Sequence, residues 1–281
     1  MPRTILVIPC YNEEQRLQES AFIEFVEQQS EIRLLFVNDG SKDGTLTKLE
    51  QLAANFPVGM DVCDLPRNGG KAEAVRQGML AALTTDAECI GFLDADLATP
   101  LEAVPQFVNV MHNFPTIDVV LGTRLPLLGR KIQRNRKRQL LGRLFATVAS
   151  RTLGVPLQDT QCGAKLFRVT PALRGALSQP FLARWIFDVE LLARLQRLRP
   201  SLQEAPLLDA IYEQPLDKWT EVPGSKLKAT DFLKAPGELL QIYSRYLSPW
   251  SAVPDLSSVP LPVMRPFAKP TVKIWRERRS A

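Results

Sequence analysis

Residues 89–100 read CIGFLDADLATP, a short apolar run that ends in two aspartates and leads to a proline. The run at 89–93 predicts a buried β-strand, and Pro100 favours the start of the next helix. Alternate residues of a strand point to the same side, so Asp94 and Asp96 can converge on one cation. Carboxylate oxygens suit Mg²⁺ or Mn²⁺, which bind through one or two carboxylates and substrate phosphates. Taken alone, the same residues also fit a solvated turn that caps a helix.

The sequence on either side of this stretch alternates between strand and helix patterns. Apolar runs predict strands at 4–9, 32–38, 60–63, 89–93 and 118–122. Apolar residues at helical spacing predict helices at 14–27, 45–55, 72–83 and 101–112. Such alternation indicates an α/β domain with a mainly parallel sheet, covered by helices on both faces.

Polar residues follow each predicted strand at the point where it ends. In parallel sheets, ligands bind outside the carboxyl ends of the strands. These polar residues therefore predict one binding site along that edge. The clusters are Tyr11-Asn12-Glu13, Asp39-Gly40-Ser41, Asp64, Asp94-Ala95-Asp96 and Thr123-Arg124.

Two of these positions match parts of a nucleotide. Asn68-Gly69-Gly70-Lys71 opens a predicted helix, where free N–H groups and a lysine form an anion site. Asp39 could accept a hydrogen bond from a base or a ribose hydroxyl. The simpler alternatives are a glycine turn with a surface lysine and an Asx turn at Asp39.

The composition limits the chemistry. A chain of 281 residues, 45% hydrophobic and 23% charged, is a globular protein and not a disordered one. The single histidine, His112, excludes a Ser-His-Asp triad and a histidine-based metal site. Four scattered cysteines without a CxxC pair indicate structural thiols in a reducing compartment. Since no signal peptide or membrane-spanning run is apparent, we expect a cytoplasmic protein, or one held at the surface of a membrane.

The charge of +5 is concentrated in one segment. Between Asp118 and Asp159 there is no acidic residue but nine lysines and arginines, which attract phosphate groups. The helix predicted at 140–153 carries an apolar stripe that suits an anionic membrane surface. The same stripe could equally pack on the domain. Further on, a strand is predicted at 165–168, helices at 171–178 and 188–198, and a proline-rich extended tail from 246 to 281.

In these motifs the chain resembles family 2 glycosyltransferases of the GT-A fold, most closely the dolichyl-phosphate β-glucosyltransferase and polyprenyl-phosphate glycosyltransferase branch. The matching residues span roughly 4 to 228 in the order of the family. They include Ile8-Pro9-Cys10-Tyr11-Asn12-Glu13-Glu14, Val37-Asn38-Asp39-Gly40-Ser41, Gly70-Lys71-Ala72, Asp94-Ala95-Asp96, Gly122-Thr123-Arg124, Asp159-Thr160-Gln161-Cys162-Gly163, Arg184-Trp185-Ile186-Phe187-Asp188-Val189-Glu190 and Gly224-Ser225-Lys226.

The resemblance implies a role for each matching residue. The nucleoside would be held by Pro9, Tyr11, Glu13 and Asp39, with Lys71 near the nucleotide. Asp94 and Asp96 would hold Mg²⁺ or Mn²⁺ on the diphosphate, and Arg124 and Lys226 would steady its charge. Asp159 would be the catalytic carboxylate, acting with Asp96. Residues Arg130, Arg134, Arg136 and Trp185 are candidates for the acceptor side.

The resemblance also has gaps. Ala98 stands where the mannose-synthase branch has a metal-binding glutamine, and no arginine precedes the Gly-Ser-Lys motif near Trp219. Both differences favour a glucosyl-type enzyme. Ala164 replaces an aromatic residue, for which we have no physical account.

The predicted function is inverting transfer of a hexose from a nucleotide diphosphate sugar to a polyprenyl phosphate. The donor we expect is UDP-glucose. A hydroxyl acceptor, soluble or on a glycolipid, and a non-catalytic sugar-nucleotide-binding protein are the alternatives. A nucleotidyltransferase or dinucleotide oxidoreductase should have a glycine-rich loop after the first strand, which Pro9-Cys10-Tyr11-Asn12 is not. No nucleic-acid-binding module is recognisable. We expect one catalytic domain at 1–245, with a donor half to 125 and an acceptor half beyond it.

Overall fold

The computed structural model describes residues 1, 3–133, 136–222 and 229–251. Its centre is a seven-stranded sheet with the order β3-β2-β1-β4-β7-β5-β8. Only β7 runs antiparallel to its neighbours, so the prediction of a mainly parallel sheet is confirmed. The strands are β1 (Thr4–Cys10), β2 (Ile32–Asp39), β3 (Met60–Leu65), β4 (Cys89–Leu93), β5 (Val119–Thr123), β7 (Ala164–Arg168) and β8 (Ile211–Pro215).

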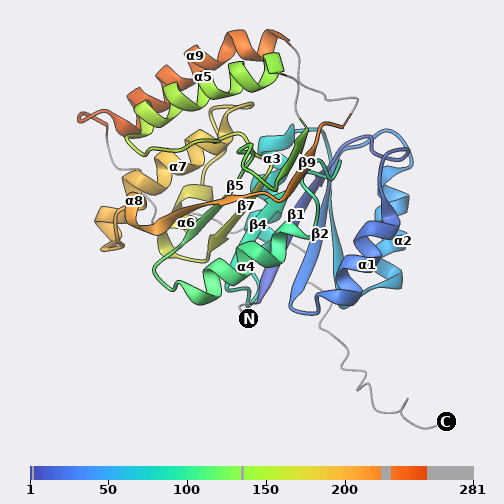
Figure 1. Cartoon of the computed structure of the whole chain (residues 1–281). Helices are drawn as coiled ribbons and strands as arrows, with labels where there is room; N and C mark the ends of the chain where they lie inside the picture. Colours follow the sequence, from blue (N-terminus) through green and yellow to red (C-terminus); the bar gives the residue numbers. More distant parts are fainter. Residues whose placement is uncertain (2, 134–135, 223–228, 252–281) are drawn as a thin grey trace, which may run out of the picture.

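Helices cover both faces of the sheet (Figure 1). Alternate residues of β1 point to opposite faces, so Leu6 and Ile8 enter one core and Ile5 and Val7 the other. The first core is closed by α1 (Glu19–Gln28), α2 (Thr45–Asn55) and α4 (Ala103–Asn113). The second is closed by α3 (Lys71–Ala82), α6 (Pro171–Leu177) and α7 (Phe187–Leu198).

Two further helices, α5 (Arg136–Leu153) and α9 (Ala229–Ile242), appear together above α7 in the view of Figure 1. Both contribute to the second core, through Ala149 of α5 and Leu239 of α9, among others. The chain continues into a π-helical turn, η2 (Tyr243–Leu247), where Tyr246 is buried. Tyr246 was predicted to begin the tail, whereas the structure places it in the core. Residues 252–281 lie outside the described part, so the predicted domain division stays a prediction.

The predicted elements agree with the structure in most places, and the differences have local causes. The helix predicted at 14–27 begins only at Glu19, because Glu14 instead bonds to the loop after β2, through Asp43 and the N–H of Gly44. The sequence analysis did not predict α9, which contains Pro236, or several short elements. These are β6 (Lys131–Gln133), β8, β9 (Lys218–Thr220), α8 (Leu207–Ala210) and η1 (Arg199–Leu202).

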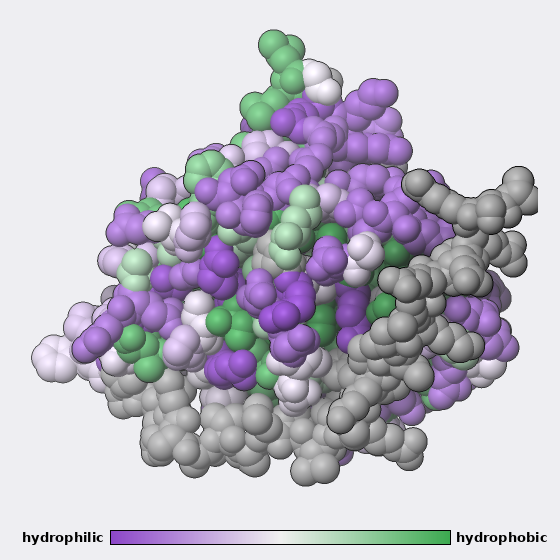
Figure 2. Space-filling view, turned by 90° about the horizontal axis from the view of Figure 1, so that it is seen from below, coloured by the Kyte–Doolittle hydropathy of each residue, from purple (hydrophilic) through white to green (hydrophobic). Residues whose placement is uncertain are grey.

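The surface is uneven in polarity. Figure 2 shows a face that is mainly hydrophilic, with apolar residues scattered singly. By contrast, α5 exposes Leu140 (71% accessible), Leu144 (63%) and Val148 (43%), and α9 exposes Leu240 (68%). Among the described helices, none combines the length and apolar content that crossing a bilayer requires.

Candidate active site

The loops that follow β1 and β2 are tied to each other at the carboxyl edge of the sheet. The backbone N–H of Asn12 donates to Ser41 Oγ at 3.0 Å, and that of Lys42 donates to Asn12 Oδ1 at 2.9 Å. The backbone N–H of Glu13 donates to Thr45 Oγ1 at 2.8 Å. Asn12 has a φ of 49°, a left-handed conformation that asparagine tolerates better than most residues. The two loops therefore form one rigid ledge.

Asp39, the last residue of β2, fixes the loop that opens α3. Its Oδ1 accepts the N–H of Gly69 at 2.7 Å, and its Oδ2 accepts the N–H of Gly70 at 2.9 Å. Burial raises the pKa of Asp39, although the two backbone hydrogen bonds act to lower it. Gly40 has a φ of 61°, and a Cβ there would lie 2.6 Å from the carbonyl carbon of Arg67. This close approach brings the start of α3 to the end of β2.

Lys71, the first residue of α3, contacts the first aspartate of the Asp-Ala-Asp motif. Its Nζ lies 2.5 Å from Asp94 Oδ1. Desolvation acts to lower the pKa of Lys71, but Asp94, then Asp188 and Asp96, raise it overall. The N–H of Asp94 donates to Gly163 O at 3.1 Å, and a Cβ at Gly163 would lie 2.1 Å from Asp94 Oδ2. The carboxylate therefore lies directly against the backbone of Gly163.

Asp96 lies two residues further along the same turn. Its Oδ1 accepts the N–H of Ala98 at 3.1 Å, and its Oδ2 lies 4.0 Å from Arg16 Nη2. Burial, and next the charge of Asp94, raise the pKa of Asp96. Leu97 has a φ of 53°, which marks a tightly bent turn. The two carboxylates repel each other, and a divalent cation between them would relieve this repulsion.

These two aspartates provide a suitable but incomplete set of metal ligands. In the part of the chain that the structure describes, no group of three or more His, Cys, Asp and Glu could hold a metal by itself. Mg²⁺ and Mn²⁺ commonly complete such a shell with substrate phosphates and water. The donor set therefore fits a hard cation that arrives together with a diphosphate.

Arg124 and Asp159 form a bidentate ion pair at the end of β5. Arg124 Nε donates to Asp159 Oδ2 at 2.6 Å, and Nη2 donates to Oδ1 at 2.7 Å. The backbone N–H of Arg124 also donates to Oδ2 at 3.1 Å. Burial alone would lower the pKa of Arg124, but Asp159 raises it overall. Since the guanidinium lies 5.2 Å from the ring centre of Trp219, it is held from two sides.

Lys165 and Asp188 form a second ion pair, which is buried. Lys165 Nζ lies 3.2 Å from Asp188 Oδ1 and donates to Cys162 O at 2.6 Å. Burial raises the pKa of Asp188, against the opposing effects of Lys165 and then Lys71. Acidic residues in the first turn of a helix, such as Asp188 and Glu190 in α7, usually interact with the helix dipole at the surface. Both are instead buried and ion-paired, Glu190 with Arg194 at 2.6 Å.

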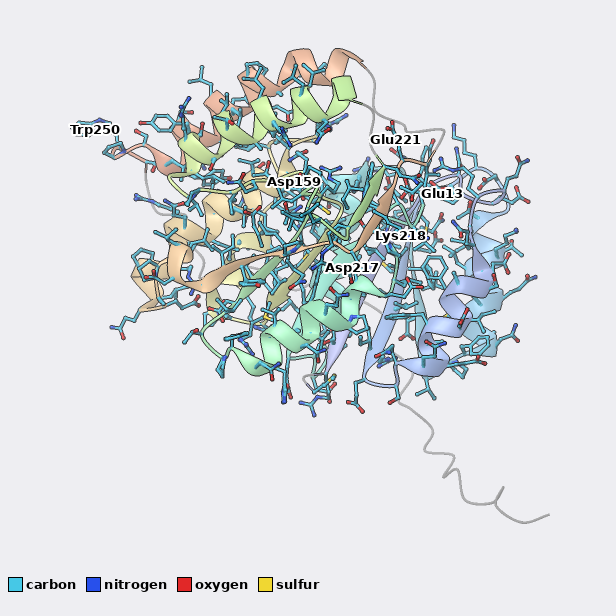
Figure 3. The ribbon with its side chains drawn as sticks, viewed as in Figure 1. Glu13, Asp159, Asp217, Lys218, Glu221 and Trp250 are labelled. Carbon is cyan, nitrogen blue, oxygen red and sulfur yellow. The ribbon has the colours of Figure 1, made fainter. Side chains whose placement is uncertain are left out.

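The remaining predicted site residues are less centrally placed. Arg130 forms an ion pair with Asp217, and the half-buried Trp185 packs on Phe145 with 5.5 Å between ring centres. In Figure 3, Glu13 and Asp159 lie toward the same upper edge, whereas Trp250 protrudes at the far side. Pro9 and Tyr11 are half-buried at the end of β1. Arg134, Lys226 and the side chain of Arg136 lie outside the described residues.

The sequence profile of Glycosyl transferase family 2 matches residues 5–173, which covers every strand of the sheet except β8. The chain belongs to this family. The fold and family predicted from the motifs are thereby confirmed, and the protein is a glycosyltransferase of family 2.

Relatives within this glycosyltransferase family match over most of their length. A dolichyl-phosphate beta-glucosyltransferase of Trichomonas vaginalis is 29% identical, over 92% of this chain and 76% of the relative. The proteins of that name from Drosophila melanogaster and Homo sapiens are each 31% identical, over 86% of this chain and 74% or 75% of theirs.

Solved structures show the same fold. Glucosyl-3-phosphoglycerate synthase from Mycobacterium tuberculosis, in complex with Mn²⁺, uridine diphosphate and glucosyl-3-phosphoglycerate, aligns with a TM-score of 0.60 at 22% identity. The alignment covers 90% of this chain and 81% of that one. At this identity the likeness supports the fold alone.

Residue patterns in this glycosyltransferase could not show two of the contacts above. Arg16 lies in a segment predicted as helix, and nothing in the sequence pairs it with Asp96. Lys165 falls in a predicted strand, where a buried charge is unexpected. A lysine inside an apolar strand is nevertheless a signal in itself, because it needs a buried partner.

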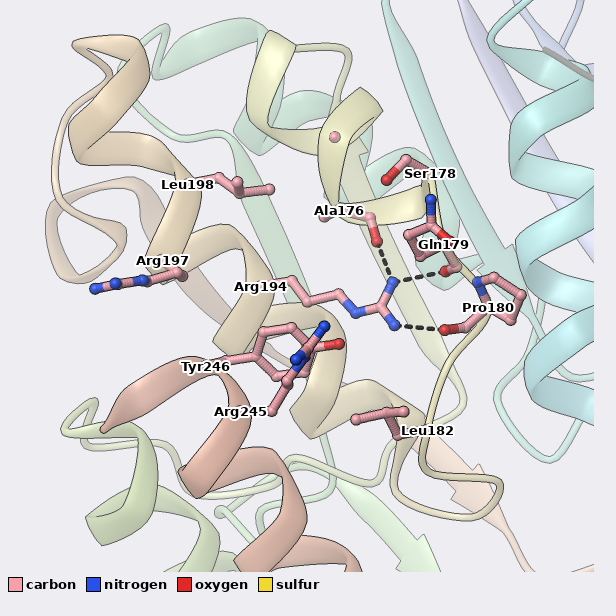
Figure 4. A pocket seen from close by; sticks show the side chains of 11 residues that line it. Ala176, Ser178, Gln179, Pro180, Leu182, Arg194, Arg197, Leu198, Arg245 and Tyr246 are labelled. Atoms are coloured by element: carbon pink, nitrogen blue, oxygen red, sulfur yellow. Dashed lines mark hydrogen bonds between the residues drawn. The ribbon is translucent and has the colours of Figure 1, made fainter. Parts of the chain in front are cut away.

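One pocket of the described structure lies away from the strand ends. It has a volume of about 250 Å³ between α6, α7 and η2 (Figure 4). Arg194 reaches into it, but its guanidinium donates to the carbonyl oxygens of Ala176, Gln179 and Pro180 as well as to Glu190. Because these bonds use its N–H groups, Arg194 holds the fold together and is not available to a ligand.

Proposed function

We propose that this family 2 glycosyltransferase transfers a hexose, with inversion, from a uridine diphosphate sugar to a polyprenyl phosphate. The bidentate ion pair of Arg124 and Asp159 is the observation that favours a phosphate acceptor over a hydroxyl acceptor. A hydroxyl acceptor needs a general base, and both oxygens of Asp159 are already engaged by Arg124. A phosphate monoester has a second pKa of about 6, so it is largely anionic at neutral pH and needs no base.

The ledge formed by the first two loops supports the proposed nucleoside site. Tyr11 and Glu13 stand on the loop that this ledge makes rigid, and Asp39 fixes the start of α3 beside it. A rigid site lowers the entropy cost of holding a nucleoside. Pro9 completes the proposed contacts at the end of β1.

We place the diphosphate between the start of α3 and the Asp-Ala-Asp motif. A helix leaves its first N–H groups without partners inside the helix, and the dipole favours an anion there. Lys71 stands at that position, and Asp94 and Asp96 would hold Mg²⁺ or Mn²⁺ beside it. When bound, the cation would stabilise the charge that develops on the departing diphosphate. Arg124 and Lys226 are proposed to add positive charge.

The names of the relatives favour the same donor and acceptor classes. Relatives about 30% identical are named dolichyl-phosphate beta-glucosyltransferases, which supports a glucosyl group and a polyprenyl phosphate. The solved Mycobacterium tuberculosis enzyme was crystallised with Mn²⁺ and UDP-glucose, which supports a uridine nucleotide and metal dependence.

A polyprenyl acceptor lies in a membrane, so the enzyme must approach one. We propose that α5 and α9 provide this peripheral contact at the cytoplasmic face. Their outer surfaces expose Leu140, Leu144, Val148 and Leu240, while Arg143 and Arg151 of α5 are exposed beside them. Apolar residues flanked by arginines suit an anionic lipid surface. Arg130, Arg134, Arg136 and Trp185 belong to the same acceptor half in this proposal.

Organic extraction after incubation tests the proposal. The full chain is incubated with Mn²⁺, polyprenyl phosphate and one radiolabelled nucleotide sugar at a time. We expect label in the organic phase with UDP-glucose and none without the divalent cation. Label that stays in water while UDP is released would indicate a hydroxyl acceptor. If UDP were released from no donor, the protein would be one that binds sugar nucleotides without catalysis, and the proposal would be contradicted.

A further inference from the structure

Lys71 occupies the position where a cation would meet Asp94. Its Nζ lies 2.5 Å from Asp94 Oδ1, which makes this a close ion pair. The other side of the carboxylate rests against Gly163, where even a Cβ would collide at 2.1 Å. Asp94 is therefore confined between the ammonium and the backbone of the loop before β7.

Asp96 is held differently. Its Oδ1 accepts a backbone N–H at 3.1 Å, and the nearest guanidinium, that of Arg16, is 4.0 Å from Oδ2. Of the two proposed metal ligands, Asp94 therefore forms a close ion pair at 2.5 Å, whereas the cation that faces Asp96 is 4.0 Å away.

A cation that bound Asp94 through Oδ1 would come within a few ångströms of the ammonium. Metal–oxygen distances of roughly 2.0–2.2 Å leave little room beside a nitrogen already 2.5 Å from the same oxygen. Repulsion between the two positive charges would then oppose binding. A diphosphate changes this balance, because it offers Lys71 another anionic partner at the start of α3.

We propose that Lys71 is an exchangeable counter-ion of Asp94, which makes binding of the divalent cation depend on binding of the nucleotide diphosphate. Lys71 moves from Asp94 to the diphosphate as the donor binds, and Asp94 becomes available to the cation. The inference rests on the proposed function, since it assumes that a nucleotide diphosphate and a cation share this site. It adds that the cation binds with the nucleotide and not before it.

Titration with Mn²⁺, followed by electron paramagnetic resonance of the free ion, tests the exchange. The full chain is titrated with and without saturating UDP. Wild type should bind Mn²⁺ weakly alone and at least about tenfold more tightly with UDP, a coupling within the usual range. Lys71→Gln should bind nucleotide-free Mn²⁺ about tenfold more tightly than wild type, so UDP should enhance its affinity far less.

Two variants serve as controls. Lys71→Arg keeps the positive charge and should keep most of the coupling. Lys48→Gln removes a lysine that pairs with Glu19 at 3.1 Å on the outer helices, and it should behave as wild type. If Lys71→Gln gained no affinity for nucleotide-free Mn²⁺ while wild type bound it with UDP, the exchange would be overturned and the proposed function would stand. If wild type bound no Mn²⁺ even with UDP, the proposed function would be contradicted as well.

Discussion

Two carboxylates at the edge of the sheet are in contact with a cationic side chain from another element. Asp94 faces Lys71, and Asp159 faces Arg124. An ion pair of this kind holds both side chains in place before a substrate arrives, although the pair of Lys71 and Asp94 is proposed to separate once the donor binds. The two pairs have different roles in the proposed reaction. The site of Lys71 and Asp94 receives the leaving diphosphate, and the pair of Arg124 and Asp159 supports the acceptor side without acting as a base.

The role of Asp159 can be tested through pH. If Asp159 positions Arg124, Asp159→Asn should lower kcat/KM by roughly 10- to 100-fold, because the amide cannot hold both guanidinium nitrogens. The shape of the pH–rate profile should stay the same. Loss of its acidic limb in Asp159→Asn would instead identify Asp159 as a general base.

The buried thiols provide a second test at this scale. All four cysteines are free and buried, and burial raises the pKa of Cys63 and of Cys89 to about 11. A raised thiol pKa means less thiolate at a given pH, roughly a hundredfold less at pH 8 than for an ordinary cysteine. We expect almost no alkylation of native protein by iodoacetamide at pH 8 and complete alkylation in guanidinium, as read by mass spectrometry. Rapid labelling of Cys63 or Cys89 in the native protein would contradict this packing.

Residue patterns predicted which side chains gather at the strand ends but not how they pair. Asp94, Asp96 and Lys71 were chosen because each follows a strand or opens a helix. The pairing of Arg124 with Asp159 depends on β7 lying between β4 and β5, and periodicity carries no information about that order. A contact between residues 35 positions apart is fixed by topology.

At the scale of elements, α7 holds the second half of the molecule together. Glu190 is fully buried and accepts hydrogen bonds from Arg194, from the backbone of Leu182 and Ala183, and from Tyr246 Oη. Through these contacts one carboxylate joins α7, the loop after α6 and the turn that follows α9.

Breaking this ion pair should therefore be costly. Arg194→Met leaves a buried carboxylate without its cation, and we expect a loss of roughly 3–5 kcal/mol in the free energy of unfolding, measured with urea. The matched control is Lys48→Met, which breaks a more exposed pair with Glu19 and should cost less than about 1 kcal/mol. Equal losses in the two variants would show that Glu190 is not the anchor described here.

The outer face of α5 carries the proposed membrane contact. Leu144→Asp adds a charge where we expect lipid, so sedimentation with vesicles rich in anionic lipid should fall several-fold. Leu208→Asp is the matched control, because Leu208 of α8 is also exposed (53%) but lies outside α5 and α9. If both variants sedimented like wild type, α5 would not be the docking face.

Element patterns were a better guide to the first half of the chain than to the second. Strands β1 to β5 are apolar and regularly spaced, and each was predicted within two residues of its observed ends. In β8 most residues are only half-buried, so the strand lacks the apolar signature of a central strand. Pro236 lies inside α9, where proline normally argues against a helix. Burial of Ala235, Leu239 and Ile242 in the second core stabilises the helix despite that local preference.

At the scale of the whole molecule, the fold places the chemistry at one edge. The loops after β1, β2 and β4 and the start of α3 meet there because parallel strands share one carboxyl end. This consequence of the α/β alternation could be predicted from the sequence. The positions of α5 and α9 could not be predicted in the same way. They depend on how residues late in the chain complete the second core.

The central claim is that Asp94 and Asp96 hold a divalent cation on the donor diphosphate. Isothermal titration of UDP, with and without Mn²⁺, tests it in wild type, in Asp96→Asn and in the control Asp86→Asn, whose aspartate is exposed and pairs with Arg3. We predict that Mn²⁺ strengthens UDP binding at least about tenfold in wild type and in Asp86→Asn, but not in Asp96→Asn. Equal strengthening by Mn²⁺ in Asp96→Asn and in wild type would contradict the account.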